Sequence, residues 1–172
     1  MKKIEYLLTL IIFLLLPFLI GAQTITGKVV GISGGDTITI LDAQQRQHQI
    51  RLYGIDCPES KQHFGRAAKR HTSNLAANKT AHVQIYDTDR YGRAVGVVTV
   101  DDVNINQSLI ENGLAWQYHK YCNAPFCNHW KNIEARVRAQ QLGLWKNADP
   151  TPPWQWRKGS KNSSCVHKSA NN

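Results

Sequence analysis

The sequence predicts a small α+β domain whose strands form a barrel. Five short segments rich in β-branched residues are separated by turn signals, as in a run of short strands. The helical patterns come late, after the third of these segments, and do not alternate with the strands one by one. We therefore expect an α+β barrel and not an alternating parallel sheet.

The five predicted strands are separated by polar or glycine-containing turns. They span residues 24–32, 37–41, 47–53, 81–86 and 94–100. Ser33-Gly34-Gly35 is the turn signal between the first two strands, and it places Asp36 at the entrance of the second. The third strand alternates between two faces. We interpret the first three strands as a meander linked by hairpins.

Three helices are predicted from apolar residues at helical spacing. They span residues 64–78, 105–111 and about 130–142. Asn112-Gly113 is a pair that commonly ends a helix, and it closes the second one. His71 lies on the apolar face of the first helix, where we expect a residue at the edge of the core and not a metal ligand.

The first 22 residues have the pattern of a secretory signal peptide. Lys2 and Lys3 precede an apolar run over residues 7–20, and Gly21-Ala22 supplies small residues for cleavage. The run is shorter than the roughly 20 apolar residues that a membrane span needs. Cleavage here predicts a secreted or periplasmic protein, and retention as an uncleaved anchor is the alternative.

The rest of the chain divides into one domain and a tail. Residues 23–148 are enough for one domain with a single core. From residue 149 the sequence changes to Asp-Pro-Thr-Pro-Pro-Trp-Gln-Trp-Arg-Lys and then to Ser, Asn and Lys. We interpret residues 149–172 as a proline-rich strap followed by a disordered basic tail.

Positive charge is in clear excess. The chain has 21 Lys and Arg against 12 Asp and Glu, a formal net charge of +9. Such an excess suits a polyanionic partner. A cationic, soluble surface with no such partner is the alternative that charge alone leaves open.

Four cysteines in an exported chain permit two disulfides. Cys122 and Cys127 enclose only four residues, so a local bridge between them is the simplest pairing. Cys57 and Cys165 then either pair or stay free. Zinc binding by Cys122, Cys127 and His129 is disfavoured, because no further ligand completes the usual spacing.

Polar residues gather where the predicted strands end. If the barrel closes, several of them converge at one rim: Asp36, Arg51, Asp56, Glu59, Arg90, Tyr91 and Arg93. Two carboxylates and a backbone carbonyl offer oxygen ligands, which suit a hard cation such as calcium. Two arginines match the demands of a phosphate, and a glutamate can orient or deprotonate a water.

Four stretches in register resemble the thermonuclease family, the staphylococcal-nuclease-like domains. They are Gly35-Asp36-Thr37, Arg51-Leu52-Tyr53-Gly54-Ile55-Asp56-Cys57-Pro58-Glu59, Asp89-Arg90-Tyr91-Gly92-Arg93 and Asn112-Gly113-Leu114-Ala115. The resemblance covers residues 24 to 145. It implies an α+β OB-fold, a five-stranded β-barrel with three α-helices. It also implies a calcium-dependent endonuclease or exonuclease that hydrolyses phosphodiester bonds of DNA and RNA.

The resemblance also implies roles at the cation. Asp36 and Asp56 match the carboxylate ligands of calcium, with the carbonyl of Cys57 as a third protein oxygen. Glu59 matches the carboxylate usually assigned as general base for the attacking water. We expect the Cys57 thiol to be structural and not a nucleophile, because the neighbouring carboxylates disfavour a thiolate.

Further positions match residues that contact the substrate. Arg51 and Arg93 match the pair that grips the scissile phosphate, and Arg90 and Tyr91 match contacts to the neighbouring phosphate. Tyr118 is expected to offer a stacking face for a base. Phosphate contacts and stacking do not read sequence, so we expect little sequence specificity and a preference for single-stranded or flexible substrates. A monomer is expected.

Two departures from the family pattern bear on the site. Staphylococcal nuclease has an acidic residue where Gly34 stands, so we expect weaker calcium binding here. Residues 119–128 differ and carry the added cysteine pair.

Two other functions compete with the nuclease. An OB-fold can bind single strands without cutting them, and a cationic envelope protein can bind polyanions through charge alone. The presence together of five residues favours the enzyme: Asp36, Arg51, Asp56, Glu59 and Arg93.

Overall fold

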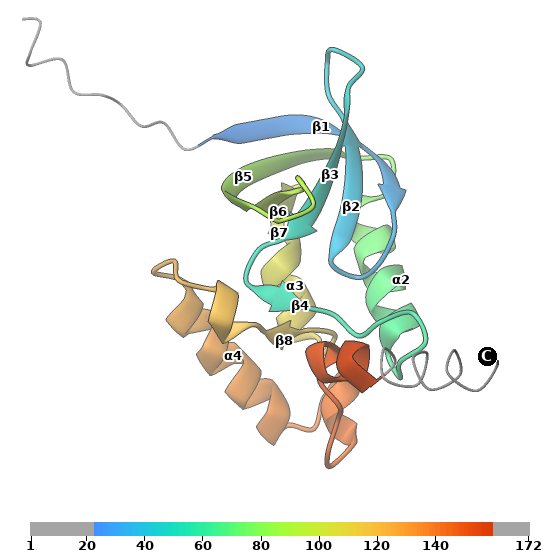
Figure 1. Cartoon of the computed structure of the whole chain (residues 1–172). Coiled ribbons are helices and arrows are strands. Elements are labelled where there is room, and N and C mark those ends of the chain that lie inside the picture. The colour runs from blue at the N-terminus through green and yellow to red at the C-terminus, as the bar shows by residue number, and fades with distance from the viewer. Residues whose placement is uncertain (1–22, 160–172) are drawn as a thin grey trace, which may run out of the picture.

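A closed five-stranded barrel forms the core of the computed structural model, which describes residues 23–159 (Figure 1). Its long strands are β1 Thr24–Ile32, β2 Thr37–Leu41, β3 Gln47–Leu52, β5 Thr80–Thr88 and β6 Ala94–Val100. Each lies within two residues of its predicted bounds. The patterns of β-branched residues and turns therefore located all five.

Hydrogen bonding between neighbouring strands closes the barrel. β1 pairs antiparallel with β2 and β5, β2 with β3, and β5 with β6. β3 and β6 then pair in parallel, which joins the two ends of the sheet. The expected OB-fold barrel is confirmed.

The strands bury one face inside the barrel and expose the other. On β3, Ile50 and Leu52 are almost fully buried, whereas Arg51 between them is only partly buried. Because successive side chains on a strand point to opposite faces, Arg51 lies on the outer face. The alternation that buries Ile50 and Leu52 in the core therefore places the Arg51 side chain outside the barrel.

Helices and short strands cover the outside of the barrel. The helices are α2 Gly65–Ala76, α3 Ile105–Glu111 and α4 Cys127–Ala139, and 3-10 turns follow at His119–Tyr121 and Gly143–Lys146. The short strands are β4 Ile55–Asp56, which pairs with β8 Trp116–Gln117, and β7 Val103–Asn104, which pairs antiparallel with the end of β6. None of the helices in the described region is long and apolar enough to cross a membrane.

Two helical features differ from the predicted pattern. α4 begins three residues before Trp130 and ends at Ala139, because Gln141 and Gly143 take left-handed backbone angles that stop it. Residues 153–159 are helical, which the interpretation of this segment as a strap and tail did not predict.

The signal-peptide prediction and the rest of the basic tail fall on residues 1–22 and 160–172, outside the described residues.

The predicted disulfide between Cys122 and Cys127 is present. It excludes these two thiols as zinc ligands. The hydroxyl of Tyr53 accepts hydrogen bonds from the backbone nitrogens of Asn123 and Ala124, at 2.8 and 3.2 Å, and so ties the disulfide loop to the end of β3. Cys57 is buried without a disulfide partner in the described residues, and Cys165 lies outside them.

Asn106 joins α3 to the barrel. Its Oδ1 accepts from the backbone nitrogen of Val98 at 3.0 Å, and its Nδ2 donates to the carbonyls of Tyr53 and Gly96 at 3.0 and 3.2 Å. The side chain is fully buried. Because unpaired buried polar groups are costly, this one amide fixes the helix and two barrel segments together.

Replacing Asn106 by Ala should therefore destabilise the fold. We expect the free energy of unfolding to fall by about 2–4 kcal/mol, because several buried backbone groups lose their partner. Urea denaturation monitored by circular dichroism measures the change. Asn128→Ala, at an exposed position in the first turn of α4, is the control and should change stability by less than about 0.5 kcal/mol. Equal effects of the two substitutions would contradict the role given to Asn106.

Candidate active site

One guanidinium bridges two buried carboxylates on the outer face of the barrel. Asp36 directly precedes β2, Arg51 lies on β3, and Asp56 lies on β4. Arg51 Nη1 is 2.5 Å from Asp36 Oδ1, and Arg51 Nη2 is 2.5 Å from Asp56 Oδ1. The side chain of Asp56 is fully buried, and that of Asp36 is 7% exposed. The structure thus brings together three of the predicted site residues.

Backbone contacts hold Asp36 in this position. Its Oδ2 accepts from the backbone nitrogen of Cys57 at 2.7 Å. Thr72 Oγ1 on α2 donates to the carbonyl of Gly35 at 2.5 Å. A Cβ on Gly35 would lie 2.8 Å from Cys57 Sγ and 2.7 Å from the Cβ of Ala68, so only glycine fits here. The glycine before Asp36 lets the turn pack against both α2 and the Cys57 segment.

Burial dominates the electrostatics of this cluster. It raises the pKa of Asp36, Arg51 acts in the opposite direction, and the charge of Asp56 adds to the rise. Burial likewise raises the pKa of the Cys57 thiol well above its usual value, with Asp36 the next cause. The expectation that this thiol is no nucleophile agrees with these shifts, although burial is a larger cause than the flanking carboxylates considered from the sequence.

Glu59 lies on the loop between β4 and α2, close to the carboxylate pair. Its backbone nitrogen donates to Gln62 Oε1 at 2.8 Å. A Cβ on Gly65 would lie 1.9 Å from the Glu59 carbonyl oxygen, so the helix can begin this close to the loop only with glycine. The Glu59 side chain is 40% exposed. A carboxylate in this setting can hold a water molecule.

Arg157 is a site residue that the sequence reasoning missed. Its Nη2 is 2.8 Å from Asp56 Oδ2, and its Nη1 is 3.2 Å from Asp56 Oδ1 and 2.7 Å from Glu59 Oε1. It belongs to the helical stretch 153–159. The signal for it was Trp154-Gln155-Trp156-Arg157, because paired tryptophans are unusual in a disordered segment.

Arg93 is placed near the cluster but not in contact with it. β3 and β6 pair with Arg51 opposite Val95, two residues beyond Arg93, so both arginines belong to the same face. Arg93 Nε donates to Asp89 Oδ2 at 2.7 Å, and its guanidinium lies 5.6 Å from the ring centre of Tyr91. The backbone nitrogen of Arg93 also donates to Asp89 Oδ1 at 3.0 Å, so within residues 23–159 Arg93 bonds to its own loop and not to the carboxylate cluster.

Arg90 and Tyr91 lie at the exposed tip of the β5–β6 loop. Arg90 Nη2 donates to the Tyr91 hydroxyl at 2.7 Å, and its guanidinium lies 4.8 Å from the ring centre. Tyr91 is 69% exposed. The pair is therefore available to a ligand. In the described part of the chain, it makes no contact with the carboxylate cluster.

Tyr118 follows β8, and its ring is already stacked. The ring of Trp154 lies parallel to it, with centres 4.8 Å apart and planes 7° apart. Tyr121 packs edge-on against Tyr118 at 4.8 Å. The ring of Tyr118, which was predicted to stack on a base, is therefore covered by a residue of the C-terminal segment.

The oxygen ligands expected for calcium are present as a pair. Among the described residues, no group of three or more His, Cys, Asp and Glu side chains gathers as a metal site. Asp36 and Asp56 nevertheless lie on either side of one guanidinium, and carboxylate oxygens are the donors that calcium prefers. This donor chemistry fits a hard cation that keeps several waters.

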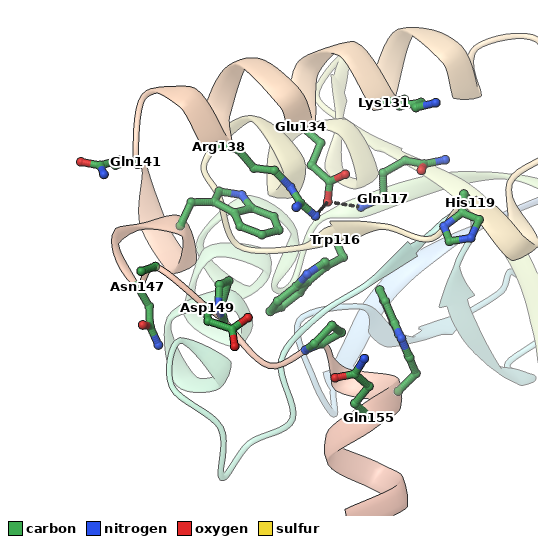
Figure 2. A pocket seen from close by; sticks show the side chains of 15 residues that line it. Trp116, Gln117, His119, Lys131, Glu134, Arg138, Gln141, Asn147, Asp149 and Gln155 are labelled. Carbon is green, nitrogen blue, oxygen red and sulfur yellow. Dashed lines mark hydrogen bonds and ion pairs between the residues drawn. The ribbon is translucent and has the colours of Figure 1, made fainter.

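An open groove of about 760 Å³ lies between α4 and the chain that follows it, and its lining includes Trp116 and Trp154 but not the carboxylate cluster. Figure 2 shows Glu134 of α4 inside the groove, accepting from the backbone nitrogen of Gln117 and from Arg138. Burial raises the pKa of Glu134, and Arg138 opposes that rise. Trp116 and Asp149 line the same groove, which therefore separates α4 from the C-terminal segment.

The chain is similar along most of its length to proteins that are named as nucleases. A family described as "Staphylococcal nuclease homologue" matches residues 49–147. A protein of Escherichia coli named "Uncharacterized endonuclease" is 42% identical over 134 residues, which cover 77% of this chain and 85% of that protein.

Two further relatives show the same likeness. "Micrococcal nuclease" of Shigella flexneri is 36% identical over 147 residues, 80% of this chain and 83% of the relative. An "Uncharacterized endonuclease" of Haemophilus influenzae is 35% identical over 136 residues, 79% and 75% of the two chains.

The matched family region contains most of the site. Arg51, Asp56, Glu59 and Arg93 fall within residues 49–147, whereas Asp36 and Arg157 fall outside. The match covers more than half of the chain, and the relatives align over most of their own length. The chain therefore belongs to the staphylococcal nuclease family.

Proposed function

We propose that this protein is a calcium-dependent nuclease that hydrolyses phosphodiester bonds of DNA and RNA with little sequence specificity. The observation that carries the proposal is the bridge from Arg51 to two buried carboxylates, with Glu59 beside them. The family and the names of the relatives support the same chemistry. A secreted or periplasmic location belongs to the proposal, and the disulfide supports it.

In this proposal, Asp36, Asp56 and the carbonyl of Cys57 hold the cation. Calcium, when bound, supplies positive charge that polarises a phosphoryl oxygen. The two aspartates are fixed before any ligand arrives, because Arg51 and the backbone nitrogen of Cys57 already bond them. Such preorganised charge is often the largest contribution to catalysis.

Arg51 and Arg93 are proposed to bind the scissile phosphate. Arg51 lies on β3 and Arg93 directly precedes the neighbouring strand β6 on the same face, so a phosphate between them can accept from both. Arg93 would then exchange its bond to Asp89 for the phosphate. Arg90 and Tyr91 at the loop tip are proposed to contact the neighbouring phosphate, and Tyr118 to stack on a base.

Glu59 is proposed to orient and deprotonate the attacking water. It is partly exposed and lies close enough to Asp56 for one guanidinium to reach both carboxylates. A single-stranded substrate suits the site, because stacking on Tyr118 needs an unpaired base. The protein is proposed to act as a monomer.

A non-catalytic single-strand-binding module is the competing function. The barrel and the positive charge serve that function equally well. Binding alone, however, gives no reason to bury two carboxylates beside a phosphate site, because they repel the backbone of the nucleic acid. The carboxylate cluster therefore favours the nuclease.

Chelation should abolish cleavage of denatured DNA, and added calcium should restore it. The reason is that the proposed ligands are hard oxygen atoms. Fluorescence of a quenched single-stranded substrate measures the rate. Full activity in excess chelator would refute the metal assignment, and binding without cleavage in calcium would favour the competing module.

Glu59→Gln should lower turnover by on the order of 100-fold or more, because it removes the proposed base. Affinity for a single strand should change little, since no positive charge is lost. Single-turnover cleavage and fluorescence anisotropy separate the two effects. Glu111→Gln, on the exposed side of α3, removes the same charge away from the site and should leave both unchanged. A Glu59→Gln protein with a normal rate would exclude this residue as the base.

Gly34→Asp should strengthen calcium binding. A Cβ at this position would lie 3.7 Å from Asp36 Oδ1, which is ordinary contact, so the added carboxylate fits beside the proposed ligand. A carboxylate this close to a bound cation attracts it appreciably, even near the protein surface. We therefore expect the dissociation constant for calcium to fall roughly 5-fold or more. Titration calorimetry with calcium chloride measures it, and Gly34→Asn is the neutral control of equal size. Equal calcium affinity of the two variants would contradict the placement of the cation.

A further inference from the structure

The C-terminal segment reaches back over the candidate site. We call residues 149–159 the strap. Gln62 Nε2 holds it by donating to the carbonyl of Thr151 at 3.0 Å. Figure 1 shows its helical part, in red, beside β4 and β8. Two further contacts, by Trp154 and Arg157, fall on groups to which the proposed function gives a role.

Arg157 occupies the acidic groups. It forms a bidentate pair with Asp56 and a third bond with Glu59. With the strap in place, Asp56 Oδ1 accepts from both Arg51 and Arg157. A divalent cation at Asp56 would meet the charge of Arg157 at close range, so the two disfavour each other.

Trp154 occupies the aromatic face. Its ring lies parallel to that of Tyr118, as a stacked base would. The side chain also packs edge-on against Trp116, with ring centres 6.3 Å apart. A base can stack on this face of Tyr118 only when Trp154 leaves.

The strap is attached in a way that permits release. The groove of about 760 Å³ lies between it and α4, and Asp149 and Gln155 line this groove (Figure 2). Gln155 is exposed, and the Arg157 side chain is 40% exposed. A segment with solvent beside it and few buried side chains opens at low cost compared with the core.

We propose that the strap is an autoinhibitory pseudo-ligand, in which Trp154 stands in for a base and Arg157 for the cation. This inference rests on the proposed function of the same site. Calcium and a single strand would each bind the open form of the strap in preference to the closed form. Binding of one ligand would therefore strengthen binding of the other. Arg157 does not act as a phosphate ligand in the closed form, because both its Nη atoms face carboxylates.

The test measures binding and not activity. Calcium chloride is titrated calorimetrically into the unsubstituted chain and into Arg157→Gln, and an oligothymidine is titrated in chelator by anisotropy. A strap closed about nine-tenths of the time weakens apparent affinity about tenfold, so Arg157→Gln should bind both ligands about tenfold more tightly. Lys158→Gln, at the exposed neighbour, removes the same charge and should bind neither ligand more tightly.

A second pair of variants tests the aromatic contact. Trp154→Ala should also tighten oligothymidine binding, whereas Trp156→Ala, which alters a partly exposed tryptophan two residues away, should not. Limited trypsin digestion follows opening directly, because the protease cleaves after Arg157 and Lys158. Calcium should accelerate this cleavage in the unsubstituted chain.

The outcomes separate the strap from the proposed function. If every variant bound calcium and oligothymidine with the affinities of the unsubstituted chain, the strap proposal would fail and the nuclease proposal would stand. Weaker oligothymidine binding by Arg157→Gln than by Lys158→Gln would also overturn the strap proposal, since Arg157 would then hold the substrate. If no form bound calcium, both proposals would fail.

Discussion

The position of one guanidinium between two buried carboxylates determines much of this structure. Arg51 bonds Asp36, which precedes β2, and Asp56, which lies on β4. Without Arg51, two negative charges would face each other away from water, and breaking such a buried pair costs on the order of 3–5 kcal/mol. Arg51 therefore offsets the repulsion between the two buried carboxylates. The same bonds that stabilise the turn also hold together the two carboxylates that we propose as cation ligands.

Closure of the barrel brings distant segments to that site. The parallel pairing of β3 with β6 puts the loop containing Arg93 on the face that carries Arg51. The short pairing of β4 with β8 brings Tyr118 beside Asp56, and the backbone nitrogen of Tyr118 bonds the carbonyl of Gly54 at 2.8 Å. Acidic, basic and aromatic groups thus meet because the sheet closes, although they are far apart in the chain.

Local sequence patterns predicted the elements that are long enough to show a regular spacing of apolar residues. The five long strands show β-branched alternation, and α2 and α3 show helical spacing, so their bounds were confirmed closely. β4 and β8 have two residues each, too few to show any period, and they form only because the chain segments meet. The residue motifs located Asp36, Arg51 and Asp56, which the structure does bring together. Arg157 was missed because its ion pairs span about a hundred residues of sequence, and a proline-rich composition conceals a helical stretch.

The charge balance of the site explains why a strongly basic chain gathers acid there. Three carboxylates, Asp36, Asp56 and Glu59, face two guanidiniums, Arg51 and Arg157, while the strap is closed. Departure of Arg157 leaves the same three carboxylates with Arg51 alone, so the site gains one net negative charge. A more negative site attracts a divalent cation more strongly. A single strand gains the uncovered face of Tyr118 when the strap opens, and the positive charge elsewhere on the chain still attracts its backbone. In the proposed mechanism, a cation that replaces Arg157 restores the positive charge beside the carboxylates, and the scissile phosphate can then approach them.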